Sequence, residues 1–351
     1  MTARHFDPAI VMPLLFAELF FFLLVILAAA EIFTNALEHL GEKLHISEGV
    51  TGSLFAAVGT ALPETLVPIL AIIGGTADQT VNHEIGVGAI LGAPLMLGTL
   101  TCCMMAIAAL RQRGLHGHIR PEPTGLKRDL SFFLAGYAIA TLAMFVPHQY
   151  DSLHLRGMLS FVLVLLYFVY MLVTLKASSA LVEAGHGTEA ENTMYLAWLR
   201  VPVNLFTIVI QLGLGLTLLV WGAEGFIDGV AGASSFLHIS PLLLSLLIIP
   251  IATELPEKIN SILWVRRDKD TLAFGNITGA MVFQGTLLPA IGIALTPWVP
   301  RPEVFLGLVI TLVAACWLRH LARHPGGIRI RHLMLNGVLY ASYLVLAITL
   351  S

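Results

Sequence analysis

The chain has 351 residues, of which 57% are hydrophobic and only 12% are charged. A soluble domain averages about 25% charged residues, and at this length it cannot bury so much apolar surface. The high hydrophobic fraction and the low charged fraction therefore point to a protein of the lipid bilayer. The formal net charge of −3 gives no reason to expect a nucleic-acid partner.

Ten apolar stretches are each long enough to cross a membrane, which takes about 20 residues of helix. In chain order they cover 9–32, 48–73, 85–110, 130–147, 157–176, 203–228, 240–264, 271–296, 302–320 and 333–350. The first stretch lacks the basic segment of a cleavable leader, so we interpret it as a retained helix. These stretches predict an all-α polytopic membrane protein.

The most polar stretch near the middle of the chain separates two groups of five helices. The expected organisation is a first repeat over 1–176, a cytoplasmic linker over 177–200 and a second repeat over 201–351. Lys and Arg gather in cytoplasmic connections, which sets the orientation. Fifteen of these residues lie in connections on one side and three on the other, so both termini are expected outside a cell (inner) membrane.

Short motifs recur in the two halves of the chain at a constant spacing of 193 residues. The segment 30–64 contains AEIF, LHIS and TALPE, and the segment 223–257 contains AEGF, LHIS and TELPE. A second pair of blocks, GAILGAPLMLGTL from Gly88 and GNITGAMVFQGTL from Gly275, shares seven of thirteen positions. Because each unit has an odd number of helices, two successive copies are inverted, a design that places substrate at the repeat interface. Simple duplication in a scaffold protein is the alternative.

The TALPE and TELPE motifs place a helix-breaking proline and a carboxylate in helices 2 and 7. Pro63 and Pro256 each lack an amide hydrogen and free carbonyls about one turn upstream, so both helices are expected to be broken. Free carbonyls in lipid are costly unless they line a polar cavity or bind something. With Glu64 and Glu257 they supply the oxygen ligands that hard cations prefer, and inversion brings the two breaks face to face. The two glutamates are predicted to hold one metal ion between them; a buried structural carboxylate is the alternative for each.

Helices 3 and 8 carry matched G-x-x-x-G spacings that begin at Gly88 and Gly275. This spacing lets helix backbones approach closely, so packing against the broken helices is the expected role. Two amides, Asn276 and Gln284, interrupt the apolar sequence of helix 8. An amide oxygen there can ligate a cation or hydrogen-bond a carboxylate, which makes both residues candidates for a coupling-ion or supporting role.

The doubled blocks GTALPE and ATELPE, each followed by a G-x-x-x-G-A helix, resemble the repeats of the cation/Ca²⁺ exchanger superfamily, closest to its sodium/calcium exchanger branch. The resemblance covers most of the chain and implies an alternating-access antiporter whose cation sites are built by helices 2, 3, 7 and 8. It places the family's Ca²⁺-binding glutamates on Glu64 and Glu257. It places the threonines whose carbonyls help to bind ions on Thr60 and Thr253.

Other positions depart from the family pattern. Serines of the exchangers' sodium sites are replaced here by Ala61, Ala93 and Ala280. The second break gains Glu254 and Lys258, whose i, i+4 spacing places them on one face of a regular helix. We therefore predict coupling to H⁺ rather than Na⁺. For Lys258 two alternatives stand beside a titrating role: a fixed internal cation standing where Na⁺ would sit, or a side chain that snorkels or pairs with Glu254.

The function predicted from these residues is export of a divalent cation, Ca²⁺ in the first place, in exchange for H⁺ or Na⁺. The expected partners are inorganic cations and lipid, with no cofactor. A cation channel using the same carboxylates is one alternative, although the chain lacks a ring-forming filter motif. A transporter of another metal, such as Mn²⁺ or Mg²⁺, is a second. An intramembrane enzyme is disfavoured because no H-E-x-x-H or other catalytic motif occurs.

Overall fold

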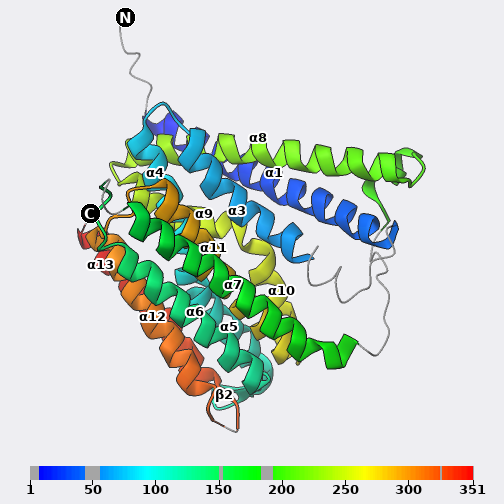
Figure 1. The fold of residues 1–351 in the computed structure, drawn as a ribbon, viewed down its shortest axis with the longest axis vertical. Helices are drawn as coiled ribbons and strands as arrows, with labels where there is room; N and C mark the ends of the chain where they lie inside the picture. Colours follow the sequence, from blue (N-terminus) through cyan, green and yellow to red (C-terminus); the bar gives the residue numbers. More distant parts are fainter. Residues whose placement is uncertain (1–7, 44–55, 150–152, 183–192, 325, 351) are drawn as a thin grey trace, which may run out of the picture. The chain divides into compact units, whose positions relative to one another are not determined.

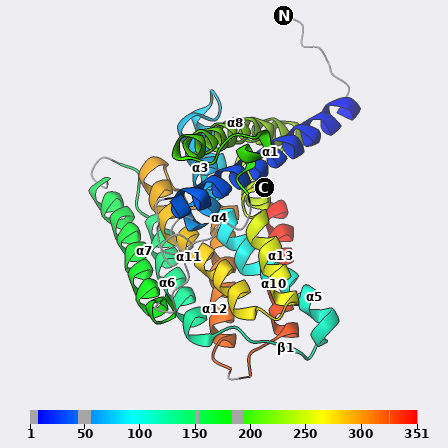
Figure 2. The same ribbon diagram turned by 90° about the vertical axis from the view of Figure 1, so that its right-hand side faces the viewer.

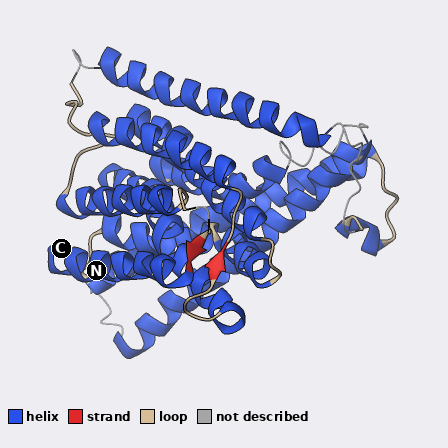
Figure 3. Ribbon diagram, turned by 90° about the horizontal axis from the view of Figure 1, so that it is seen from below, coloured by secondary structure: helices blue, strands red, loops and turns tan. Residues whose placement is uncertain are grey.

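The structure, a computed structural model, describes residues 8–43, 56–149, 153–182, 193–324 and 326–350. Its α-helices are α1 (Pro8–Lys43), α3 (Ala56–Gly74), α4 (Gln79–Met96), α5 (Cys102–Arg113), α6 (Pro123–Ala143), α7 (Leu153–Val182), α8 (Leu205–Leu237), α9 (Pro241–Thr253), α10 (Leu255–Arg266), α11 (Asp270–Leu295), α12 (Pro302–Leu321) and α13 (Ile330–Leu350). A π-helical turn, η2 (Leu97–Thr101), joins α4 to α5, and a 3₁₀ turn, η4 (Tyr195–Leu199), precedes α8. Strands β1 (His118–Ile119) and β2 (Ile328–Arg329) form the small antiparallel ribbon visible in Figure 3.

The described helices give the ten membrane segments expected from the sequence. Seven spans are long and apolar enough to cross a membrane, one of them being α4, η2 and α5 taken together. The shorter apolar helices α3 and α9, the latter continued by α10, supply two more segments. The tenth is α6, which has the length but begins with a polar second turn. The all-α polytopic class is therefore confirmed.

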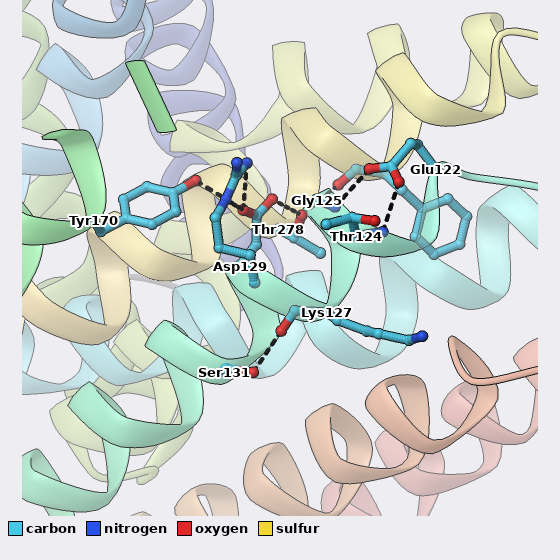
Figure 4. Close-up of polar contacts among 10 residues, drawn as sticks. Glu122, Thr124, Gly125, Lys127, Asp129, Ser131, Tyr170 and Thr278 are labelled. Atoms are coloured by element: carbon cyan, nitrogen blue, oxygen red, sulfur yellow. Dashed lines mark hydrogen bonds and ion pairs between the residues drawn. The ribbon is translucent and has the colours of Figure 1, made fainter. Parts of the chain in front are cut away.

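The helix α6 begins earlier than its apolar stretch predicted. Pro123 occupies its first turn, and the Glu122 carboxylate accepts hydrogen bonds from the amides of Thr124 at 2.7 Å and Gly125 at 2.6 Å (Figure 4). Proline at the first helical position is a start signal, and a side-chain oxygen that accepts from the free amides of the first turn caps the helix. The apolar criterion missed this start because residues 127–129 are all charged.

The chain forms two compact units, residues 1–82 with 174–241 and residues 83–173 with 242–351. Each unit combines segments from both halves of the sequence. The units are therefore not the two sequence repeats, whose boundaries at 176 and 201 stay a prediction.

In the first unit, α1 and α8 pack side by side along their lengths (Figure 1). A Cβ atom on Gly215 would lie 2.9 Å from the backbone nitrogen of Phe33, and one on Gly229 would lie 2.9 Å from the Leu19 side chain. Residue numbers rise along α8 as they fall along α1, so the two helices are antiparallel. Helices 1 and 6 of an uninverted duplication cross the membrane in the same direction, so this antiparallel pairing accords with inversion.

The predicted break in helix 7 is present. α9 ends at Thr253 and α10 starts at Leu255, with Glu254 between them at φ −105° and ψ 12°. Pro256 falls in the first turn of α10, where its missing amide hydrogen does not end the new helix. The sequence therefore located this interruption correctly.

Helix 2 differs from the expectation. α3 continues as one helix through Pro63 and Pro68. Each proline removes one backbone hydrogen bond, but the helix persists, and the Thr65 hydroxyl donates to the Ala61 carbonyl at 2.7 Å. The first half thus keeps a released carbonyl without a visible interruption of the helix.

The matched glycines of helices 3 and 8 have different surroundings. A Cβ on Gly88 would lie 2.5 Å from the Leu242 carbonyl oxygen, and one on Gly92 would lie 2.8 Å from Pro250. At Gly275 no described atom lies within 4 Å of that position, and at Gly279 the nearest is a tyrosine hydroxyl 3.7 Å away. The expected close approach is therefore real for α4 against α9 and is not seen at the two matched glycines of α11.

This contrast predicts unequal effects of alanine at the matched positions Gly92 and Gly279. Gly92→Ala is expected to lower the free energy of unfolding by about 1–3 kcal/mol because the added methyl group overpacks a backbone contact. Gly279→Ala is the control and is expected to be neutral or stabilising, since alanine is the better helix former. Melting temperatures of the purified proteins in detergent check both; equal losses would contradict the assigned packing.

Three connections of the second unit meet at one end (Figure 2). Arg113, after α5, binds Asp268 at 2.8 Å and Asp270 at 2.8 Å, between α10 and α11. The ribbon of β1 and β2 pairs His118 with Arg329 and so adds the connection after α12. These connections follow helices 3, 7 and 9, which the charge distribution assigned to one face of the membrane.

Arg156, at the start of α7, is buried and caps the carboxyl end of α11. Its guanidinium donates to the carbonyls of Ile293 and Thr296 at 2.6 Å each, Pro297 at 3.1 Å and Val146 at 3.2 Å. Cations favour helix carboxyl ends because the last carbonyls there carry partial negative charge. This contact holds α11, the helix that carries Asn276 and Gln284.

Candidate cation site

The interruption between α9 and α10 gathers polar side chains inside the second unit. Thr253, Glu254, Glu257 and Lys258 are between 0% and 5% exposed. Ionisable groups at membrane depth are rare and usually functional. Three of them within five residues mark this interruption as the strongest candidate site in the unit.

Lys258 points inward. Its Nζ donates to the Pro250 carbonyl at 2.7 Å, lies 2.8 Å from the Met96 sulfur and lies 3.6 Å from Oε2 of Glu254. The pairing with Glu254 anticipated from the i, i+4 spacing is therefore present. Because the lysine is 4% exposed and bound on the inside, snorkelling toward the membrane surface is wrong.

Glu257 stands in the first turn of α10, directly after Pro256. Its Oε2 is buried and has no hydrogen-bond partner among the described residues. Pro256 has no amide hydrogen to give the Ala252 carbonyl one turn upstream, just as Pro63 has none for Gly59. A carboxylate and a backbone carbonyl are both oxygen ligands for a hard cation. No group of three or more His, Cys, Asp or Glu suited to a metal occurs in the described part of the chain.

The two amides of α11 face the interruption from the neighbouring helix. Asn276 donates to the Glu257 carbonyl at 3.2 Å and to the Ser261 hydroxyl at 3.0 Å, which ties α11 to α10. Gln284 is fully buried and lies beside the Glu254 carboxylate. The hydrogen bonds of Asn276 thus go to a backbone carbonyl and a hydroxyl rather than to a carboxylate, whereas Gln284 is the amide beside a carboxylate. Cation ligation stays a prediction for both.

The first-half residues of the predicted site lie in the other unit. Glu64 is on α3 and is 4% exposed. Thr60 also falls on α3, but its side chain lies outside the described residues. Glu64 belongs to the first unit and Glu257 to the second. The predicted metal clamp between the two glutamates remains a prediction.

Asp129 is a buried carboxylate that the sequence reasoning missed. Its oxygens accept hydrogen bonds from Thr278 at 2.8 Å and Tyr170 at 3.3 Å and pair with Arg128 at 3.1 Å (Figure 4). The expected helix began at residue 130, so this acid was read as part of a connection. The start signal at Pro123 places it two turns inside α6, where it joins α6, α7 and α11.

Comparison with known families identifies the family of this chain. The model of the sodium/calcium exchanger proteins matches two segments, residues 14–176 and 207–349. The chain belongs to the sodium/calcium exchanger family. These segments include both the α3 proline-glutamate pair and the interruption between α9 and α10.

Relatives of this exchanger-family chain include a putative antiporter and an inner membrane protein. It is 26% identical to the CaxA protein of Alkalimonas amylolytica over 286 residues, 79% of each chain. It is 25% identical to the inner membrane protein YrbG of Escherichia coli over 304 residues, 85% of this chain and 87% of YrbG. Two solved structures share its fold. The H⁺/Ca²⁺ exchanger CAX matches with a TM-score of 0.62 at 18% identity, covering 95% of this chain and 88% of CAX. The sodium-calcium exchanger NCX_Mj matches with a TM-score of 0.55 at 19% identity, covering 95% of this chain and 98% of NCX_Mj.

Proposed function

We propose that this protein is a secondary active antiporter that exports Ca²⁺ by alternating access. The observation that carries the proposal is Glu257, a buried carboxylate whose Oε2 has no hydrogen-bond partner among the described residues and which directly follows the carbonyl-releasing Pro256. The same proline and glutamate recur at Pro63 and Glu64 in the other half of the sequence, where Glu64 is also buried. Inverted repeats are the design in which one half moves against the other around a fixed midplane site.

The proposed coupling ion is H⁺. Ala61, Ala93 and Ala280 lack the hydroxyl oxygens that would help to coordinate Na⁺ at the positions of the family's serines. The second half instead has two neighbouring acids, Glu254 and Glu257, both buried. A buried carboxylate such as Glu257 can hold a proton while the divalent cation is absent and release it when the cation binds, which favours exchange of the cation for protons.

Reconstitution separates an antiporter from a channel that uses the same carboxylates. Proteoliposomes loaded with Ca²⁺ are placed in Ca²⁺-free medium with and without an opposing H⁺ or Na⁺ gradient. An antiporter releases Ca²⁺ only when a counter-ion is available, whereas a channel releases it in both cases. Parallel assays with Mn²⁺ and Mg²⁺ define the metal, and release without any counter-ion overturns the proposal.

We further propose that the protein lies in the cell (inner) membrane with both termini outside. A cysteine at Leu115, an exposed position after α5, is expected to react with an impermeant maleimide only after the cytoplasm is opened. The background lacks the native Cys102, Cys103 and Cys316. A cysteine at His148, in the connection after α6, is the matched control and is expected to react in intact cells. The reverse pattern would invert the proposed topology.

A further inference from the structure

The two halves differ at the turn that carries the site glutamate. With the 193-residue offset, Ala61 corresponds to Glu254 and Thr65 corresponds to Lys258. In α3 the Thr65 hydroxyl donates to the Ala61 carbonyl at 2.7 Å, a neutral local contact. At the interruption between α9 and α10 the same two positions hold a buried ion pair, with 3.6 Å between Nζ of Lys258 and Oε2 of Glu254. The second half therefore has a positively charged side chain, Lys258, at the position where the first half has the neutral Thr65.

Two of the described neighbours of this ammonium are oxygen groups of the kind that bind monovalent cations. Its neighbours are the Pro250 carbonyl at 2.7 Å, the Glu254 carboxylate and the Met96 sulfur, and the lysine and glutamate side chains are 5% and 0% exposed. Gln284 also contacts this carboxylate. Carbonyl and carboxylate oxygens are the ligands that alkali cations also take. A tethered ammonium thus fills a space whose ligands suit a free ion.

From this arrangement we infer that Lys258 is a built-in cation of the transport site, occupying the place that a free monovalent ion such as Na⁺ or K⁺ would need to fill. The inference rests on the proposed transport function and concerns a fixed charge that stays with Glu254 throughout the cycle. With the ammonium in place, Glu254 is balanced and Glu257 is left for the divalent cation. The chain then needs no alkali cation to assemble its site.

A variant that lacks only the lysine is expected to require a free monovalent cation, such as Na⁺ or K⁺, at the site. In Lys258→Ala, the Glu254 carboxylate stays buried with its counter-charge gone, a strongly unfavourable state. A free Na⁺ or K⁺ can enter the vacated space and restore the balance. The double variant Glu254→Ala with Lys258→Thr copies the first half and removes both charges together, so it should not need the ion.

The first test measures Ca²⁺ movement with the same monovalent cation on both sides of the liposome membrane. The media contain N-methylglucamine, Na⁺ or K⁺ at equal ionic strength. The rate of the wild type and the rate of the double variant are each expected not to depend on the medium. Lys258→Ala is expected to be at least roughly tenfold slower in N-methylglucamine and to recover in Na⁺ or K⁺, in line with the cost of an unpaired buried charge. A rate for Lys258→Ala that does not depend on the medium overturns the inference.

A second test needs no transport and so separates this inference from the proposed function. The melting temperature of each purified protein is measured in detergent in the same three media. Na⁺ or K⁺ is expected to raise the melting temperature of Lys258→Ala, because a ligand that binds only the folded state stabilises it. The wild type, Lys258→Arg and Glu254→Gln are expected to show no such shift. Stabilisation of the wild type by Na⁺ as well would mean that the space is not already filled, and would overturn the inference.

Poor recovery of Lys258→Ala also decides the question. If the protein is recovered only when Na⁺ or K⁺ is present during purification, the ion replaces the ammonium as inferred. If it fails in every medium while the double variant is recovered, the lysine is a purely structural partner of Glu254. If the wild type itself transports no Ca²⁺, the proposed function is rejected. The melting experiment still tests the role of Lys258 in that case.

Discussion

Glu64→Gln and Glu257→Gln are each expected to reduce Ca²⁺ transport to the background of empty liposomes while the protein stays folded. Both carboxylates are buried, and each directly follows a proline that releases a carbonyl. The amide keeps the shape of the side chain but removes the charge that a divalent cation needs. Loss of an outer-shell group already costs a metal site roughly 10–100-fold in affinity, and a direct ligand is expected to cost more. Radiolabelled Ca²⁺ uptake into proteoliposomes measures the effect.

The chain offers a matched control for these two substitutions. Glu31 and Glu224 are also related by the 193-residue offset, but both are exposed, and Glu31 accepts a hydrogen bond from the Tyr195 hydroxyl at 2.7 Å. Glu31→Gln and Glu224→Gln make the same charge change away from the proline turns and are expected to keep most of the activity. Near wild-type uptake by either proline-turn variant would remove that glutamate from the site.

Ca²⁺ movement is expected to follow an imposed pH gradient in liposomes that contain no Na⁺. Each pH unit corresponds to about 1.4 kcal per mole of H⁺, which supports about a tenfold Ca²⁺ gradient for every proton exchanged. A pH-sensitive dye inside the liposomes should report proton movement opposite to that of Ca²⁺ and in step with it. The physical reason is that Ala61, Ala93 and Ala280 stand where the family has serine hydroxyls, while the second half carries two buried acids, Glu254 and Glu257.

Two further arms make the coupling experiment decisive. An imposed Na⁺ gradient at constant pH is expected to move little Ca²⁺, and liposomes with Glu257→Gln are expected to show neither Ca²⁺ nor proton movement. Strict dependence on Na⁺ with no response of the internal dye would contradict H⁺ coupling and indicate ordinary sodium/calcium exchange.

Much of this protein follows from the sequence alone because lipid imposes strict local rules. Every spanning segment must satisfy its own backbone, so ten apolar stretches translate directly into helices. The interruption at Glu254 followed from Pro256, and the pairing of Glu254 with Lys258 followed from their i, i+4 spacing. The two TALPE-like motifs located the candidate carboxylates, since prolines and acids are expensive in lipid and are kept there for a reason.

Only the tertiary structure decided what depends on neighbours distant in the chain. Matched glycines looked equivalent in the sequence, yet Gly92 meets another helix and Gly279 has room for a methyl group, because a motif does not specify which helix packs against it. Asp129 falls in a connection if the helix begins at residue 130 as predicted, but the observed helix begins at Pro123 and includes Asp129. The inward direction of Lys258 depends on the Pro250 carbonyl and the Met96 sulfur, the latter on a helix far away in the chain. Backbone rules act within one turn of helix and are legible in the sequence, whereas packing and charge balance are set by side chains that only folding brings together.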